Sequence, residues 1–128
     1  MIQTLLTLTS ATVLLVTASL GWAREPFSPE RFQTLQQQDA TILIEISADW
    51  CSICAIQKRI LNNFREDHPE VEWYQLVIDF DRDKQWVTEF RAPRQSTLLL
   101  YRGEQRLWFS VAEVSPDTIY KKIINAAR

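Results

Sequence analysis

An apolar, β-branched run at residues 41–48 leads almost directly into a segment with helical periodicity. The run (TILIEISA) is long enough to form a buried strand. From residue 51 to about residue 67, apolar side chains recur at the spacing of one helix face, and these are Ile53, Ile56, Ile60, Leu61 and Phe64. A second apolar run follows at residues 71–79. A strand, a helix and a strand in this order require parallel pairing through a right-handed crossover, which indicates an α/β fold.

The remaining segments extend this pattern on both sides. Ser28-Pro29-Glu30 is typical of a helix start and predicts a helix to about residue 38. Downstream, the sequence predicts a helix over 81–90, a hairpin of strands 97–101 and 106–111, and a final helix after Ser115. The predicted architecture is a central mixed sheet of four to five strands flanked by helices.

The first 23 residues differ in composition from the rest of the chain. They contain no Asp, Glu, Lys or Arg, and Gly21-Trp22-Ala23 before Arg24 resembles a signal-peptidase site. An uncleaved membrane anchor and a buried core helix are the alternatives, since about 18 apolar residues come close to spanning a bilayer. A cleaved signal peptide and an anchor both predict that one domain, residues 24–128, lies in the periplasm or another extracytoplasmic compartment.

Composition excludes several classes of protein. Lys and Arg total 14 against 16 Asp and Glu, and this near balance argues against nucleic acid as a partner. An apolar fraction of 46% is enough to build a core, so the chain is not disordered. Two cysteines are too few for a disulfide-rich miniprotein, and a single histidine argues against a His-based metal site.

Cys51 and Cys54 stand two residues apart at the predicted junction of strand and helix. The unpaired N–H groups and the dipole at a helix start stabilise a thiolate at Cys51. Cys54 lies one turn further into the helix, where it can resolve a mixed disulfide. A zinc site needs about four ligands, and a structural disulfide across so short a loop stabilises little. Redox chemistry is therefore favoured over these two alternatives.

Residues 24–128 resemble the thioredoxin family over nearly their whole length. Ala48-Asp49-Trp50 before the cysteines matches the strand that leads into W-C-x-x-C in that family. The resemblance implies a thioredoxin-like fold, whose first strand would be short here, around residues 24–27, and a redox-active Cys51–Cys54 disulfide. The family also has a buried acid six residues before the first cysteine, where this chain has Glu45. Glu45 is a candidate proton relay for Cys54, and a solvent-facing position on a strand edge is the alternative.

The loop before the strand expected at residue 97 departs from the family pattern. The family has a cis-proline followed by threonine, whereas this chain has Gln95-Ser96-Thr97. A cis bond before a residue other than proline costs about 2.5–4 kcal/mol, so the Gln95–Ser96 bond is either trans or held cis by packing. By resemblance, substrate is expected to bind at Trp50, Gln95, Ser96 and Thr97.

We therefore expect a thiol–disulfide oxidoreductase that acts on protein thiols and disulfides as a monomer, without an organic cofactor. The negative neighbour Glu45 favours reduction or isomerisation over oxidation, because it disfavours a thiolate. A membrane electron donor is expected, since a reductant in an oxidising compartment needs electrons. The alternative is a metal-binding or metal-delivery module that uses the thiolates of Cys51 and Cys54. The missing proline at Ser96 favours that alternative, although two thiolates are only half of a tetrahedral site.

Overall fold

The computed structural model describes residues 24–128, and the expected signal peptide or anchor at residues 1–23 lies outside the described residues. Within residues 24–128, no helix is both long and apolar enough to cross a membrane. This part of the chain forms five strands and four helices in the following order: β1 Arg24–Pro26, α1 Pro29–Gln37, β2 Thr41–Ser47, α2 Ser52–Asp67, β3 Tyr74–Asp79, α3 Lys84–Glu89, β4 Thr97–Arg102, β5 Gln105–Val111 and α4 Pro116–Ala127.

The five strands form one mixed sheet in the order β1-β3-β2-β4-β5. β1, β3 and β2 run parallel, whereas β4 is antiparallel to both β2 and β5. The unit from β2 through α2 to β3 therefore has the predicted parallel pairing. β1 is a three-residue edge strand beside β3, in agreement with the short first strand expected from the sequence. The mixed α/β architecture is confirmed.

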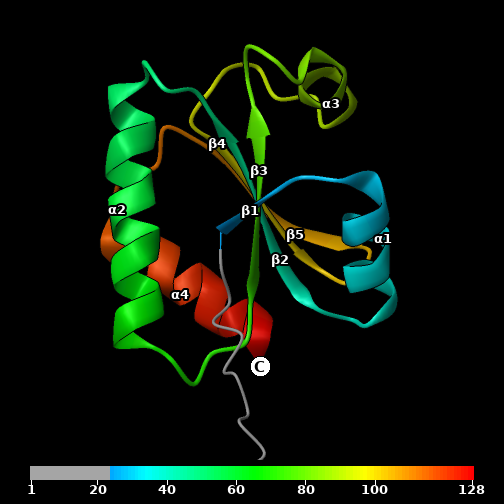
Figure 1. The fold of residues 1–128 in the computed structure, drawn as a ribbon. Helices are drawn as coiled ribbons and strands as arrows, with labels where there is room; N and C mark the ends of the chain where they lie inside the picture. The colour runs from blue at the N-terminus through cyan, green and yellow to red at the C-terminus, as the bar shows by residue number, and fades with distance from the viewer. Residues whose placement is uncertain (1–23) are drawn as a thin grey trace, which may run out of the picture.

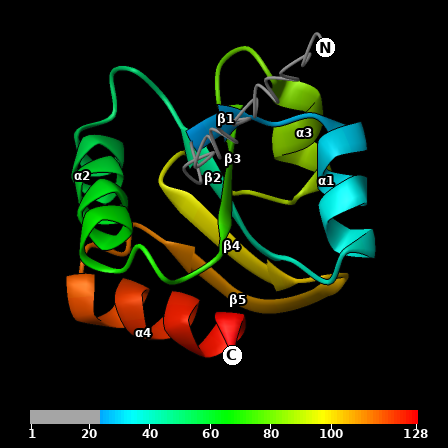
Figure 2. The same cartoon turned by 60° about the horizontal axis from the view of Figure 1, so that its bottom comes forward.

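The helices cover both faces of the sheet, with α1 and α3 on one side and α2 and α4 on the other (Figure 1, Figure 2). The central strand β2 contributes to both layers because its side chains alternate. Leu43 packs in the core beneath α2 and α4, whereas Ile42, Ile44 and Ile46 pack in the core beneath α1. The same alternation places Glu45 on the face that α2 covers.

Two predicted boundaries are wrong by a few residues. The third helix begins at Lys84 instead of residue 81. Asp79 explains this difference, because its carboxylate accepts the backbone N–H groups of Asp81 and Arg82 at 3.0 and 2.9 Å. These local bonds hold residues 80–82 in a turn instead of a helix. The third strand begins at Tyr74 instead of residue 71.

Candidate active site

The two cysteines lie where β2 ends and α2 begins. Cys51 is the N-cap of α2, and its sulfur accepts the backbone N–H of Cys54 at 3.1 Å. The two residues form a disulfide, with their Cα atoms 5.2 Å apart. Cys51 is 5% exposed and Cys54 is 1% exposed. The helix start therefore directs an N–H group at the Cys51 sulfur, an arrangement that stabilises a thiolate when the bond is reduced.

Trp50 precedes Cys51 in the chain and lies on the surface. Its side chain is 63% exposed, which is unusual for so large an apolar group. The indole nitrogen donates a hydrogen bond to Asp81 at 2.7 Å, so the ring is tethered to the turn after β3. An exposed, fixed aromatic ring beside the disulfide offers a contact surface to a protein partner.

Ser96 lies in the loop that precedes β4, and its peptide bond to Gln95 is trans, as are the other bonds of residues 24–128. Its φ of 61° lies in the left-handed region. The Ser96 N–H donates to the carbonyl of Ile46 at 2.8 Å, and the Ser96 carbonyl accepts the N–H of Ala112 at 2.9 Å. Gln57 of α2 donates to the same carbonyl at 3.1 Å. These contacts settle the alternative left open by the sequence in favour of a trans bond.

The three loop residues expected to bind substrate differ in their exposure. Ser96 and Thr97 are fully buried, whereas Gln95 is half-buried. The Ser96 hydroxyl bonds to the Gln95 carbonyl, and the Thr97 hydroxyl donates to the Arg94 carbonyl at 2.7 Å. Their hydroxyl groups therefore stabilise the loop, and the substrate-binding role of all three residues stays a prediction.

Glu45 is fully buried and does not face solvent. Its carboxylate pairs with the guanidinium of Arg24 at 3.1 Å and accepts a second Arg24 hydrogen bond at 3.4 Å. The side-chain amide of Gln75 donates to it at 2.6 Å. Arg65 of α2 donates in turn to the Gln75 carbonyl oxygen at 2.6 Å. The structure therefore surrounds Glu45 with a polar network built from β1, β3 and α2.

The charges of this network act on one another. Burial lowers the pKa of the Arg65 guanidinium; Glu45 opposes that shift, and the like charge of Arg24 adds to it. Arg65 also lies over the ring of Trp73, 4.8 Å from its centroid. Arg65 is therefore a second arginine that interacts electrostatically with Glu45.

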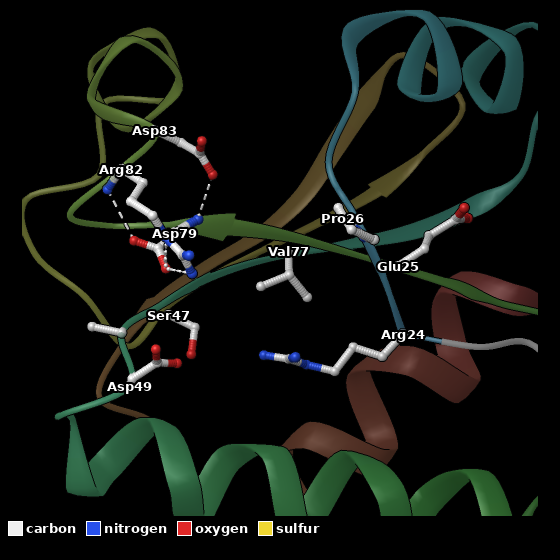
Figure 3. Close-up of a pocket in the computed structure, with 10 residues that line it drawn as sticks. Arg24, Glu25, Pro26, Ser47, Asp49, Val77, Asp79, Arg82 and Asp83 are labelled. Atoms are coloured by element: carbon white, nitrogen blue, oxygen red, sulfur yellow. Dashed lines mark hydrogen bonds and ion pairs between the residues drawn. The ribbon is translucent and has the colours of Figure 1, made fainter.

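A cleft of about 600 Å³ opens at the β1 edge of the sheet (Figure 3). Its walls come from β1, from the end of β3 with the following turn, and from the segment that leads to Cys51: Arg24, Glu25, Pro26, Ser47, Ala48, Asp49, Val77, Asp79, Arg82 and Asp83. Arg24 extends from β1 into the space between the sheet and α2. Ala48 packs against both cysteines, so the cleft adjoins the disulfide.

Asp79 is the most strongly hydrogen-bonded acid of this cleft. Hydrogen bonds from the side chain and the backbone N–H of Arg82 hold the pKa of Asp79 below its ordinary value, and the N–H of Asp81 adds to the effect. The Arg82 guanidinium reaches the Asp79 carboxylate at 2.7 Å. The carboxylate of Asp83 accepts the Asp79 N–H at 2.8 Å. These bonds fix the turn that carries Asp81, the partner of Trp50.

No observation favours the metal-binding alternative. Among residues 24–128, no three His, Cys, Asp or Glu side chains are grouped so that they could hold a metal ion. The two sulfur atoms are bonded to each other.

Sequence reasoning missed Arg24, Arg65 and Gln57 as residues that organise this region. Arg65 stands four residues after Leu61 and therefore lies on the same apolar face of α2. Its helical position could have predicted that it points toward the sheet. Gln57 also lies on that face, one turn after Cys54. Nothing in the local pattern around Arg24 predicts that its side chain reaches Glu45.

Comparison with known proteins finds thioredoxins among the relatives of this chain, although no family model matches the sequence. Thioredoxin-1 of Saccharomyces cerevisiae is 28% identical over 92 residues, which cover 72% of this chain and 86% of that protein. The crystal structure of Trxlp from Edwardsiella tarda EIB202 is 32% identical with a TM-score of 0.73, and the match covers 79% of this chain and 98% of that one. The thioredoxin of Trypanosoma brucei brucei shares the fold, with 17% identity, a TM-score of 0.70 and coverage of 84% and 94% of the two chains.

The geometry and these relatives agree on the chemistry of the site. A Cys-x-x-Cys disulfide at the start of a helix, after the central strand of a mixed sheet, can exchange with other disulfides. The relatives carry the same fold over most of their own length. The chain belongs to the thioredoxin-like family and is a thiol–disulfide oxidoreductase.

Proposed function

We propose that this oxidoreductase reduces or isomerises disulfides of exported proteins, with Cys51 as the nucleophile and Cys54 as the resolving thiol. The observation that carries the assignment is the N-cap position of Cys51, whose sulfur accepts the N–H of Cys54. Cys54 lies behind it, one turn into α2. We assign substrate binding to exposed Trp50 and to the loop of Gln95, Ser96 and Thr97.

The reaction proceeds by two thiol–disulfide exchange steps. The Cys51 thiolate attacks one sulfur of the substrate disulfide, a bond forms between them, and the second substrate sulfur leaves with the electron pair of the broken bond. Cys54 then loses its proton and attacks the Cys51 sulfur, which breaks the mixed disulfide. The substrate has gained two electrons and two protons, and the protein holds the Cys51–Cys54 disulfide.

Glu45 is the group that we assign to accept the Cys54 proton. It lies on the face of β2 that α2 covers, and α2 carries Cys54. Its carboxylate pairs with the guanidinium of Arg24 at 3.1 Å, and a carboxylate is a group that can act as a general base.

The direction of electron flow follows from what surrounds the cysteines. Strong oxidants of this kind have a stabilised reduced form. Here Ser52 and Ile53 separate the cysteines and supply no positive charge. The reduction potential of the Cys51–Cys54 pair can be measured by equilibration with glutathione. It should lie well below the value of a strong oxidant, which is about −120 mV. A potential at that value would instead identify an oxidase.

Export and anchoring are proposed from residues 1–23, which carry no charged side chain before Arg24. A membrane electron donor and a monomeric state complete the proposal. Intact mass of the protein recovered from its native cells tests the leader, since cleavage after Ala23 leaves a chain that begins at Arg24. Light scattering on the same sample tests the monomer.

A trapping experiment tests the central assignment. Cys54→Ser should accumulate mixed disulfides with substrate proteins, because Cys51 still attacks and nothing resolves the product. Cys51→Ser should lose insulin reduction and form no such adducts. Full activity in Cys51→Ser would overturn the assignment of the nucleophile. Proteins captured by Cys54→Ser in a native extract would identify the substrates.

A further inference from the structure

We propose that Arg24 is a positioning residue for the redox reaction. Its guanidinium holds Glu45 as a carboxylate beneath α2 and so sets the pH range in which Cys54 resolves the mixed disulfide. The inference rests on the role proposed above for Glu45, and it adds a residue from β1 that contacts neither cysteine.

The first step is the burial of Glu45. A fully buried carboxylate without a partner is costly, so its charge depends on what contacts it. Gln75 donates from β3 at 2.6 Å, but an amide carries no charge. Arg24 supplies the countercharge through two hydrogen bonds at 3.1 and 3.4 Å. The charge state of Glu45 is therefore coupled directly to Arg24.

The second step is to account for the other groups that face Glu45. From α2, Arg65 bonds to Gln75 and interacts electrostatically with both Glu45 and Arg24. The register partners of Glu45 are Val77 on β3 and Leu98 on β4, which are apolar. Among the described residues around Glu45, Arg24 makes the ion pair. Arg65 is connected to Glu45 through its hydrogen bond to Gln75.

The third step is the position of Arg24 in the cleft. β1 pairs with β3 so that Arg24 lies opposite Gln75, and from there its side chain reaches across β3 to Glu45 on β2. The Arg24 side chain is 30% exposed and lines the cleft, whereas Glu45 is fully buried (Figure 3). The guanidinium therefore lies between the carboxylate and the solvent of the cleft.

The chemical consequence concerns one proton. In the resolving step the Cys54 thiol gives its proton to the Glu45 carboxylate, the resulting thiolate attacks the Cys51 sulfur, and the substrate sulfur leaves with the bonding electrons. Glu45 afterwards returns the proton to solvent. A neighbouring positive charge favours the ionised carboxyl. With Arg24 in place, Glu45 can accept the proton at a lower pH than it could without it.

The resolving step can be measured by itself. Reduced full-length protein is mixed with oxidised glutathione, and tryptophan fluorescence is followed between about pH 4 and pH 9. The phase whose rate rises with glutathione concentration reports the attack of Cys51. The phase that is independent of concentration reports the attack of Cys54. The rate of this second phase should fall at low pH, and the pH range of that fall is its acid limb. In Arg24→Gln, the acid limb should move to higher pH by about one unit or more.

Matched variants separate charge from structure. Arg24→Lys keeps the positive charge and should keep the limb near its wild-type position. Arg82→Gln removes another arginine of the same cleft, one that pairs with Asp79, and should leave the limb unchanged. In a Glu45→Gln background the Cys54 thiol must lose its proton to solvent, so the resolving phase should be slower and its acid limb should lie at higher pH. Arg24→Gln should then produce no further shift.

Three results would overturn the inference: an unmoved limb in a folded Arg24→Gln, an equal shift in the Glu45→Gln background, or an unchanged limb in Glu45→Gln alone. If Arg24→Gln does not fold, infrared difference spectra of reduced wild type and Glu45→Gln decide, and a protonated Glu45 at neutral pH would overturn it. If only the role of Arg24 is wrong, the glutathione-dependent phase that reports the attack of Cys51 remains. If the oxidoreductase assignment is wrong, that phase is absent.

Discussion

Ser96 adopts a left-handed backbone conformation, which costs a residue with a side chain about 1–2 kcal/mol. Its N–H nevertheless bonds to the Ile46 carbonyl, and its carbonyl accepts from Ala112 and Gln57. The bonds on both sides of the peptide keep the residue in this conformation. The cost at Ser96 is therefore offset by contacts with β2, α2 and the segment after β5.

These contacts predict a small effect on stability for one substitution at Ser96 and a large loss for another. Ser96→Gly should change the free energy of unfolding by less than about 1 kcal/mol, because glycine adopts positive φ without strain. Ser96→Pro should lose about 3 kcal/mol or more, since proline holds φ near −65° and has no N–H for the Ile46 carbonyl. Urea unfolding of both variants is the measurement. A proline variant as stable as wild type would contradict the trans, left-handed loop.

Asp79 predicts a dependence of stability on pH. The bonds from Arg82 lower its pKa in the folded state, so the folded protein holds the Asp79 proton less tightly than the unfolded chain does. The resulting stabilisation is complete above the ordinary pKa of an aspartate and is lost as pH falls through the lowered value. Asp79→Asn should therefore cost about 1 kcal/mol at neutral pH and progressively less in acid. Urea unfolding at several pH values, with Asp117→Asn as a surface control, tests this.

At the scale of elements, α2 is joined to two other parts of the chain by one side chain. Gln57 is fully buried, and its amide nitrogen donates to the Ser96 carbonyl and to the Glu113 carbonyl, each at 3.1 Å. Its side-chain oxygen has no hydrogen-bond partner among the described residues. The helix that carries both cysteines is thus connected to the loop before β4 and to the segment before α4.

Gln57→Leu should lower the free energy of unfolding by about 1–2 kcal/mol. Two hydrogen bonds of about 1 kcal/mol each disappear, while removal of the unpaired oxygen recovers part of that loss. Lys58→Leu, at the next and exposed position of α2, should cost far less. Urea unfolding gives the two values. Equal losses in the two variants would show that the contacts of Gln57 are not the cause.

At the scale of the molecule, β2 joins the two layers of the core. Its odd and even positions pack against helices on opposite faces, so neither layer can lose its packing without affecting the other. Leu35 of α1 and Leu61 of α2 are both fully buried, one in each layer. Trp73 and Trp86 likewise lie in different layers and can serve as probes of each.

The shared strand predicts one cooperative transition. Leu35→Ala and Leu61→Ala should each lower the free energy of unfolding by about 2–5 kcal/mol. In both variants, tryptophan fluorescence and far-ultraviolet circular dichroism should report the same midpoint. Ile56 of α2 is half-exposed, so Ile56→Ala serves as the control and should lower the free energy of unfolding much less. Separate midpoints for the two signals would show that the layers unfold independently.

The sequence by itself determined the α/β class, the parallel β2–α2–β3 unit and the position of the cysteines at a helix start. Each of these follows from local patterns: the apolar run at 41–48, the helical spacing after Cys51 and the order in which they occur. The family resemblance added the redox disulfide and a buried acid at Glu45. Periodicity could assign Glu45 to a strand, and the apolar residues on both sides of it made burial plausible.

The tertiary structure alone decided which groups meet. Arg24 reaches Glu45 across 21 residues, and Gln57 reaches Ser96 across 39. The left-handed turn at Ser96 depends on contacts with other segments. Periodicity tells which face of an element is buried, because it reflects the local chain geometry. It carries no information about the partner on that face, since the partner depends on how the sheet orders its strands.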